Sequence, residues 1–567
     1  MSVEHLELVA VAAVLCIALA STFASKLGVA TPIVLVLTGV GISLLPGMPE
    51  IAPTPELILA GVLPPLLYAA AVNMPATDFR RDLRTIGALS VLLVLVSAVG
   101  IGLLLWWLLP DLSLAAAIAV GAVVSPPDAV AATSIGKRLG LPPRLLTILE
   151  GEGLVNDATA LVLLRTAVAA TAGAFSLWQA ASDFAYAVAI ASVIGALVGR
   201  LALAVRSRLD QPALTTAISF VVPFVAFLPA EAAGASGVLS VVAAGLVTGA
   251  GAVRRLSAQD RAAERTNWLT VQLLLENGVF LLMGLQLSTL VDDVQGAGLS
   301  VAAPLWIGLL VVLALTLIRA VFVLPVVSAE RRRRGGHEER ARRVEDVLAQ
   351  VTADERLLQH PRGRRIERWL QRRGADARFY AGNGLGLRGG AVLAWSGMRG
   401  VVTLAAAQSL PVDFPYRSQL VLIAFVVALV TLVVQGGTLP LLIRVLGIRG
   451  TDEEAARREL SLLIAELQEA AIGQVLDNPE LRRRDGGRFD AEVLEEVRER
   501  FGRPLPGSSG GAAPDPRTAQ RPELVQLLAE VQQDALDEAR SLGAYDSGTI
   551  ARAQKLLDAG SLRRGGL

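Results

Sequence analysis

Cysteine, histidine and aromatic residues are scarce in this chain of 567 residues, and each shortage excludes a class of protein. The single cysteine, Cys16, has no partner for a disulfide within the chain, so the fold does not depend on an oxidising compartment. Aromatic residues make up 5% of the chain and the net charge is +1, which offers few stacking platforms for bases and no overall attraction to phosphate. We therefore expect no nucleic-acid partner.

Charged residues are also sparse, at 18% against about 25% in ordinary soluble chains, whereas 53% of the residues are hydrophobic. Apolar runs of roughly 20 residues recur up to about residue 445, and each is long enough to cross about 30 Å of hydrocarbon. The segment from Met1 to Leu8 contains two glutamates and continues directly into the first run, so we predict no cleavable targeting peptide. The sequence predicts an all-α polytopic membrane protein surrounded by membrane lipids.

We predict 13 membrane-spanning helices from these apolar runs. They lie near residues 6–25, 30–46, 55–74, 85–109, 112–136, 144–172, 176–205, 212–230, 232–251, 267–291, 300–327, 387–409 and 416–444. Every second loop is rich in basic residues: Lys26, then Arg80, Arg81 and Arg84, then Lys137, Arg138 and Arg144, then Arg206 and Arg208, then Arg254, Arg255 and Arg261. Because cytoplasmic loops retain positive charge, we predict a multi-pass protein of the cell membrane with its N-terminus outside and its C-terminus in the cytoplasm.

Residues 328–386 and residues 446–567 look soluble. We predict a transmembrane domain over residues 1–445 and a cytoplasmic helical domain over 446–567. Residues 328–386 form an Arg-rich cytoplasmic loop of the transmembrane domain, which we interpret mainly as positive-inside retention, with anionic lipid or regulatory binding as the alternative. The second domain contains amphipathic segments near 452–477, 488–502, 522–542 and 547–563, with a Pro/Gly/Ser-rich linker at 502–522. We expect it to bind a regulatory ligand or partner. The preference for Arg over Lys suggests a bacterial source.

Span 5 contains the sequence Ser125-Pro126-Pro127-Asp128 in an otherwise apolar run. The two prolines remove two backbone donors and clash with the preceding turn, so we expect the helix to break there. Broken backbone at membrane depth is tolerated where it lines a cavity, and its freed carbonyls can then bind an ion. Asp128 lies beside this break.

Span 6 carries Glu152, Asn156 and Asp157 on its first half. Glu152 and Asn156 are four residues apart and share one face, whereas Asp157 points about 100° away from Asn156. A carboxylate at this depth loses hydration and needs a counter-charge, for which a proton and a metal cation compete. We expect that competition to be the chemistry of the protein.

Span 12 carries Gly397-Met398-Arg399-Gly400, which places a buried cation between glycines. We predict that Arg399 pairs with Glu152, mainly as a structural ion pair, and we leave Glu276 and Arg319 unassigned. Spans 1–6 and 8–13 form two halves with spans 5 and 12 in corresponding positions. Interrupted helices at matching positions of inverted repeats are typical of a transporter site near the bilayer midplane.

At these residues the sequence resembles the monovalent cation/proton antiporter family that includes the NhaP-type and NHE exchangers, over about residues 6–445. The most specific elements are the Asp128 stretch after the proline pair, Glu152-Gly-Leu-Val-Asn156-Asp157 and Gly397-Met-Arg399-Gly400, with weaker support from residues 277–285 and 435–438. The resemblance implies a homodimer, alternating access, a role in pH homeostasis, and exchange of Na⁺, with Li⁺ or K⁺ as alternatives, for H⁺. It assigns the transported cation and proton to Asp157, Asp128 and Asn156, with no bound cofactor.

The resemblance also bears on stoichiometry and cation preference. Asn156 in place of a second Asp resembles the electroneutral branch, which exchanges one cation for one proton. Ala69 stands where the family often carries Glu, and Gly153 replaces a Ser that can offer a ligand oxygen, so the preferred cation stays open.

Two other classes compete with a transporter. A serine-type intramembrane protease would need Ser236 with an imidazole base, but His5, His337 and His360 all lie outside the spans. An aspartyl intramembrane protease would use Asp128 with Asp157. A receptor built on an antiporter scaffold would signal through residues 446–567 without transporting. No phosphate-binding loop of an ATPase is present in the sequence, and we do not expect an enzyme.

Overall fold

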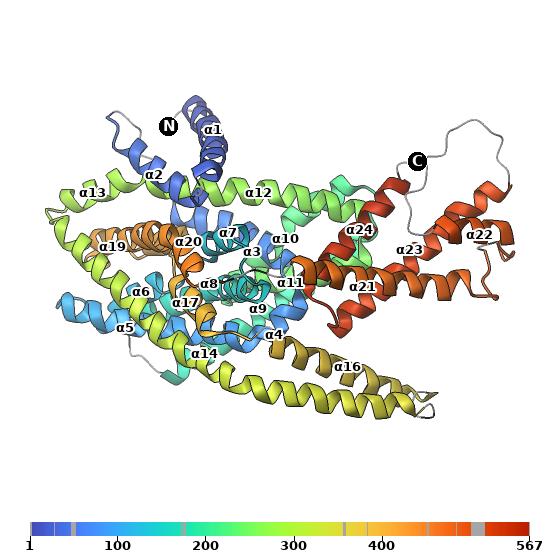
Figure 1. Cartoon of the computed structure of the whole chain (residues 1–567). Coiled ribbons are helices and arrows are strands. Elements are labelled where there is room, and N and C mark those ends of the chain that lie inside the picture. Colours follow the sequence, from blue (N-terminus) through green and yellow to red (C-terminus); the bar gives the residue numbers. More distant parts are fainter. Residues whose placement is uncertain are drawn as a thin grey trace. The chain divides into compact units, whose positions relative to one another are not determined.

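The computed structural model describes residues 3–27, 29–46, 53–171, 173, 177–354, 356, 359–382, 384–448, 450, 453–483, 485–500 and 516–565. These residues form helices and turns, and no strand occurs among them. They group into two compact units, residues 1–333 with 384–450 and residues 334–383 with 451–567. The predicted all-α class is confirmed (Figure 1).

The first unit contains most of the apolar helices and three one-turn π-helical segments labelled η. Its elements are α1 (Val3–Leu27), α2 (Thr31–Ser43), η1 (Leu57–Val62), α3 (Leu63–Asn73), α4 (Ala76–Gly87), η2 (Ala88–Leu92), α5 (Leu93–Leu108), α6 (Leu114–Val124), α7 (Ala129–Arg138), α8 (Pro143–Thr171), α9 (Leu177–Arg206), α10 (Pro212–Ala232), α11 (Gly237–Arg255), α12 (Ala258–Leu285), α13 (Leu287–Gly296), α17 (Leu387–Trp395), α18 (Val401–Gln408), α19 (Arg417–Val430), η3 (Thr431–Gln435) and α20 (Gly436–Val445). Helix α14 (Ala302–Ala353) begins in this unit and carries the chain into the second.

Among the described residues, nine helices are long and apolar enough to cross a membrane, and three shorter apolar helices lie at Val11–Ala24, Thr31–Ser43 and Leu57–Asn73. The predicted number of 13 spans stays a prediction, although each predicted range overlaps at least one helix among the described residues. Leucines such as Leu197 and Leu201 on α9 are about 60% exposed (60% and 63%), as expected of side chains that lipid solvates. The chain is a polytopic membrane protein.

The predicted break in span 5 is present, and a second break interrupts span 12. Helix α6 ends at Val124 and α7 begins at Ala129, while α17 ends at Trp395 and α18 begins at Val401. The two breaks meet, because the Asp128 backbone N–H donates to the Met398 carbonyl at 2.6 Å. Freed backbone groups of one break are thereby satisfied by the other, which membrane depth requires.

Close helix packing in the first unit depends on glycine. A Cβ on Gly121 of α6 would lie 2.1 Å from the Ala98 carbonyl of α5, and one on Gly284 of α12 would lie 2.3 Å from the Val36 carbonyl of α2. Contacts this short exclude any side chain at either position. Small residues that let backbones approach are a main source of helix association in membranes.

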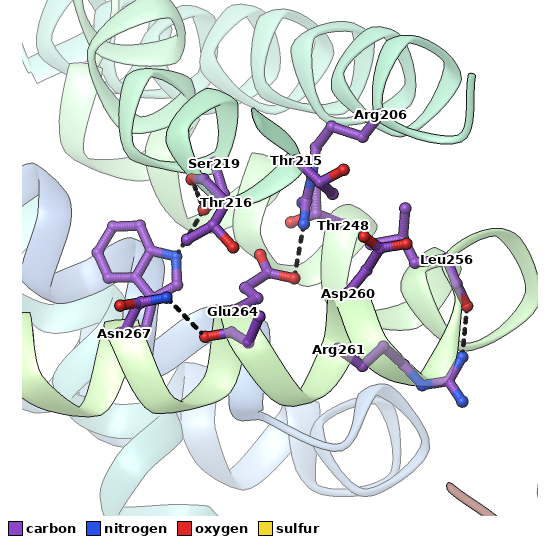
Figure 2. A network of polar contacts seen from close by, with 12 residues as sticks. Arg206, Thr215, Thr216, Ser219, Thr248, Leu256, Asp260, Arg261, Glu264 and Asn267 are labelled. Carbon is purple, nitrogen blue, oxygen red and sulfur yellow. Dashed lines mark hydrogen bonds and ion pairs between the residues drawn. The ribbon is translucent and has the colours of Figure 1, made fainter. Parts of the chain in front are cut away.

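A buried polar network ties together the helices behind one wall of the site described below. Figure 2 shows Arg206 of α9 donating to Glu264 of α12, at 2.6 Å. On the same helix, Trp268 donates its indole N–H to Ser219 of α10 at 3.0 Å. Ser236, the candidate nucleophile of the protease alternative, caps the N-terminus of α11 by accepting from the Leu239 backbone N–H at 3.3 Å.

The second unit contains the end of α14 together with α16 (Pro361–Gly382), α21 (Glu453–Ala471), η4 (Ile472–Leu476), α22 (Ala491–Arg500), α23 (Pro516–Leu542) and α24 (Ser547–Gly565). The end of α14 and α16 lie side by side, with Arg378 and Glu345 paired at 3.2 Å. Apolar side chains of α21, α22, α23 and α24 form two small cores. The predicted tail helices are present, but α23 begins inside the expected linker, whose residues 502–515 lie outside the described residues.

Candidate functional site

Asp157 lies on the uninterrupted helix α8, on the face that lines a cavity of about 590 Å³. Glu150, Gly153 and Leu154 line the same cavity, and their spacing from Asp157 is that of one helical face. The cavity also contacts Asp128 at the break. The structure therefore brings together the two acidic residues that the sequence singled out, from two different elements.

Asp128 directly precedes helix α7 and caps its first turn. Its Oδ1 accepts from the Val130 backbone N–H at 2.8 Å, so the carboxylate is the N-cap of the half-helix. Gly400 lies directly against its other oxygen, since a Cβ at that position would be 2.2 Å from Asp128 Oδ2. The position of this carboxylate thus depends on close approach of the second broken helix.

Asn156 lies against the break rather than in the cavity. Its side-chain N–H donates to the Pro127 carbonyl at 2.6 Å, and the residue is fully buried. Its own amide oxygen has no hydrogen-bond partner among the described residues. Asn156 therefore joins α8 to the unwound backbone that Pro126 and Pro127 create, next to Asp157.

Four elements besides α8 form the cavity walls. The lining includes Leu67, Ala70 and Asn73 of α3, Thr133, Ser134 and Lys137 of α7, Arg265, Gln272 and Glu276 of α12, and Gly400 to Thr403 at the start of α18. Glu276, which we left unassigned, accepts from Gln272 at 2.5 Å and faces this cavity. The spacing 265, 269, 272, 276 on α12 is that of one helical face, but the spacing does not say which neighbour that face meets.

On its other side Asp157 contacts a gap of only about 10 Å³, which is at the limit of what a single water needs. Small or branched apolar residues enclose it, among them Ala160 and Leu164 of α8 and Ala406 of α18. The site is therefore wide on the side of the larger cavity and narrow toward the C-terminal end of α8.

Arg399 lies at the crossing of the two broken helices and is 2% exposed. Its Nε donates to the Val124 carbonyl at 3.1 Å, and its Nη1 donates to the Gly397 carbonyl. Its backbone N–H donates to Thr431 Oγ1 at 2.9 Å. The guanidinium stabilises the carbonyl end of half-helix α6, where the helix dipole favours positive charge.

The prediction that Glu152 pairs with Arg399 is wrong, because Glu152 pairs with Arg319 instead. Glu152 accepts two hydrogen bonds from Arg319 of α14, at 2.5 and 2.8 Å, and Arg319 also donates to the Leu393 carbonyl at 2.8 Å. The two guanidiniums flank one glycine, since a Cβ on Gly397 would be 2.8 Å from Arg319 Cδ and 3.2 Å from Arg399 Nη1. Both arginines are basic residues at membrane depth, so the sequence offered two equivalent partners for one acid.

The crossed broken helices, with an acidic pair in a cavity beside them, are the arrangement of an ion transporter. Residues 11–445 match the family described as "Sodium/hydrogen exchanger, transmembrane". The chain belongs to the sodium/hydrogen exchanger family. A Na⁺/H⁺ exchanger of Mycobacterium tuberculosis is 31% identical over 476 residues, covering 82% of this chain and 78% of the relative.

Two further comparisons agree. The Na⁺/H⁺ antiporter ApNhaP of Aphanothece halophytica is 26% identical over 520 residues, covering 89% of this chain and 87% of that protein. The sodium/proton antiporter MjNhaP1 of Methanocaldococcus jannaschii has the same fold, with a TM-score of 0.54 and 17% identity over 78% of this chain and 99% of that one. The exchanger is thus a transmembrane antiporter by family, and its fold is that of MjNhaP1.

Proposed function

We propose that this exchanger moves Na⁺, with Li⁺ and K⁺ as further substrates, against H⁺ through Asp157. The observation that carries the proposal is the position of Asp157: it faces a cavity of about 590 Å³ on one side and a narrow gap of about 10 Å³, lined mainly by apolar residues, on the other. A single carboxylate there binds either a proton or a desolvated cation. Asp128 completes the site from the cavity wall, and Asn156 with the unwound backbone of Ser125, Pro126 and Pro127 completes it from the break.

The mechanism is alternating access. The cavity reaches Lys137 at the end of α7 and Arg265 near the start of α12. Both lie beside the basic connections that the positive-inside rule assigns to the cytoplasm, so we assign this structure to an inward-facing state with the N-terminus outside. Crossing with an empty, charged Asp157 would carry an uncompensated carboxylate through a low-dielectric barrier, which costs several kcal/mol. The loaded, neutral site crosses readily, and this coupling makes the transporter an exchanger.

The same site supports a one-to-one, electroneutral exchange. Asn156 cannot take up a proton, and its amide is committed to the Pro127 carbonyl. Each passage of Asp157 therefore carries one positive charge in either direction. The rate of Na⁺/H⁺ exchange in K⁺-free liposomes should not change when a gradient of a membrane-permeant organic cation, such as tetraphenylphosphonium, imposes a membrane potential. A rate that follows the potential would exclude this stoichiometry.

The remaining assignments are proposals of the same kind. We assign residues 1–445 to transport and residues 446–567 to cytoplasmic regulation by a ligand or partner, and we expect a homodimer that maintains cellular pH. The alternative of a non-transporting receptor makes the opposite prediction for ion flux.

The test is exchange by purified protein in liposomes that contain a pH-sensitive dye and an imposed proton gradient. Addition of Na⁺, Li⁺ or K⁺ should release protons in a saturable way and should rank the three cations. The Asp157→Asn variant should fall to the level of empty liposomes. Full exchange by that variant, or none by the wild type, would exclude the proposal.

A further inference from the structure

One ion pair in the cavity has no role in the mechanism so far. Lys137 of α7 and Glu150 of α8 are paired at 2.7 Å, and both line the cavity that leads to Asp157. Their side chains are 63% and 28% exposed. Such an exposed pair adds little to stability, because both charges stay hydrated and the ordering of two side chains offsets the attraction. Holding α7 against α8 is therefore a weak explanation for it.

Both charges lie on the route to the site. Glu150 and Asp157 are seven residues apart on the same face of α8, which separates them by roughly 10 Å along the helix axis. The other ionisable residues that line the cavity are Asp128, Arg265 and Glu276. With all six ionised, four negative and two positive charges give the cavity a net charge of −2.

We propose that Glu150, by neutralising Lys137, sets the electrostatic potential of the cavity and with it the local concentration of cations at Asp157. This inference rests on the proposed function of Asp157 and assigns Glu150 a role in cation access, without contact to the transported ion. A wet cleft between low-dielectric walls focuses the field of its charges, so one unit of charge alters the concentration of small cations inside.

The sign and size of the effect follow from Coulomb's law. Replacing Glu150 by Gln leaves the Lys137 ammonium unpaired and makes the cavity more positive by one charge. A unit charge about 10 Å away, at an effective dielectric constant between about 25 and 80, changes the local concentration of a monovalent cation roughly two- to tenfold. The potential acts on charge alone, so Na⁺, Li⁺ and K⁺ are affected equally.

Transport kinetics give the first test. Glu150→Gln should raise the KM for Na⁺, Li⁺ and K⁺ by one common factor of roughly two to ten, with kcat unchanged, and choline chloride should remove the difference by screening. Lys137→Gln should lower the KM, and the double variant should return near the wild-type value. A changed selectivity among the three cations would make Glu150 a ligand, and an unchanged KM would make it a structural residue; either result overturns the proposal.

The chain supplies a matched control. Arg165 and Glu231 are also paired at 2.7 Å, with side-chain exposures of 57% and 26%, but neither lines the cavity. Glu231→Gln should therefore leave the KM for every cation unchanged. A rise equal to that of Glu150→Gln would show that the effect does not come from the cavity.

A second test does not depend on transport. Replacing Cys16 by Ser removes the single cysteine, and Ser134→Cys then places one thiol on the cavity wall. The rate ratio of a cationic to an anionic methanethiosulfonate reagent should fall roughly four- to a hundredfold with Glu150→Gln, because the potential slows one reagent and accelerates the other by the same factor. The ratio should rise with Lys137→Gln and return in the combined variant. An unchanged ratio contradicts the proposal even if exchange is normal, whereas a changed ratio with no exchange contradicts only the function proposed for Asp157.

Discussion

At the scale of single residues, the site depends on how buried charges are shared among a few partners. Two guanidiniums, Arg319 and Arg399, lie on either side of Gly397, and one carboxylate, Glu152, binds the first of them. Asn156 provides an uncharged link between α8 and the break. Only Asp128 and Asp157 are then left to face the cavity as acids near the break.

Loss of the Glu152 carboxylate should destabilise the protein, because it leaves two neighbouring guanidiniums uncompensated. We expect Glu152→Gln to cost roughly 3–5 kcal/mol of folding free energy, measured as reduced thermal stability in detergent and reduced yield. The double variant Glu152→Gln with Arg319→Gln should recover part of that loss, since it removes one cation with the anion. Normal stability of the single variant with lost exchange would make Glu152 an ion ligand instead.

At the scale of elements, the structure depends on two broken helices that meet at Asp128, Met398 and Gly400. The Pro126-Pro127 pair made the first break predictable, because proline removes backbone donors whatever its surroundings. The second break contains no proline between Trp395 and Val401, so the sequence indicated it only through a buried cation between glycines and the correspondence of span 12 with span 5. Its position is fixed by contacts with distant elements, such as the Thr431 hydroxyl that accepts from the Arg399 backbone.

Adding a methyl group at the crossing should impair transport. Gly400→Ala would place a Cβ 2.2 Å from Asp128 Oδ2, so the carboxylate or the backbone must move. We expect the rate of Na⁺-driven proton release to fall at least tenfold, which corresponds to a rise of about 1.4 kcal/mol or more in the activation free energy. Gly437→Ala on α20 is the control, because a Cβ there meets no atom within 4 Å. Equal rates for the two variants would show that the close approach is not needed.

The packing of α2 against α12 should also be sensitive to an added methyl group. Gly284→Ala would bring a Cβ to 2.3 Å from the Val36 carbonyl, whereas Gly41→Ala on α2 meets no atom within 4 Å. We expect a cost of about 1–3 kcal/mol for the first, as overpacking of a tight contact does, and almost none for the second. Thermal unfolding in detergent measures the difference, and a stable Gly284→Ala variant would show that the two helices can separate at no cost.

At the scale of the whole molecule, the sequence predicted the helical membrane domain because lipid allows few alternatives: backbone polar groups must be satisfied within each span. It also identified Asp128, Asn156 and Asp157, since polar residues are conspicuous in apolar runs. It did not identify the polar face of α12 with Glu276, or Arg319 as the partner of Glu152, because a pattern along one helix does not say which neighbour it faces. That choice is made by packing among distant segments.

Access to the site should be one-sided in the inward-facing state. In a Cys16→Ser background, a thiol at position 134 lies in the large cavity and one at position 160 lies in the narrow gap. We expect the first to react at least a hundredfold faster with a membrane-impermeant thiol reagent added from the cytoplasmic side. Comparable rates would mean that the apolar gap admits water and that the site is not closed toward the C-terminal end of α8.

The central claim is that one carboxylate, Asp157, holds a proton or an alkali cation but never both. The most direct measurement is the initial rate of Na⁺-driven proton release in liposomes, titrated with Na⁺ at a series of pH values. Competition predicts a constant maximal rate and a KM for Na⁺ that rises with acidity, by up to about tenfold per pH unit, because each occupant displaces the other by mass action. A KM that is independent of pH, with only the maximal rate changing, would contradict the account.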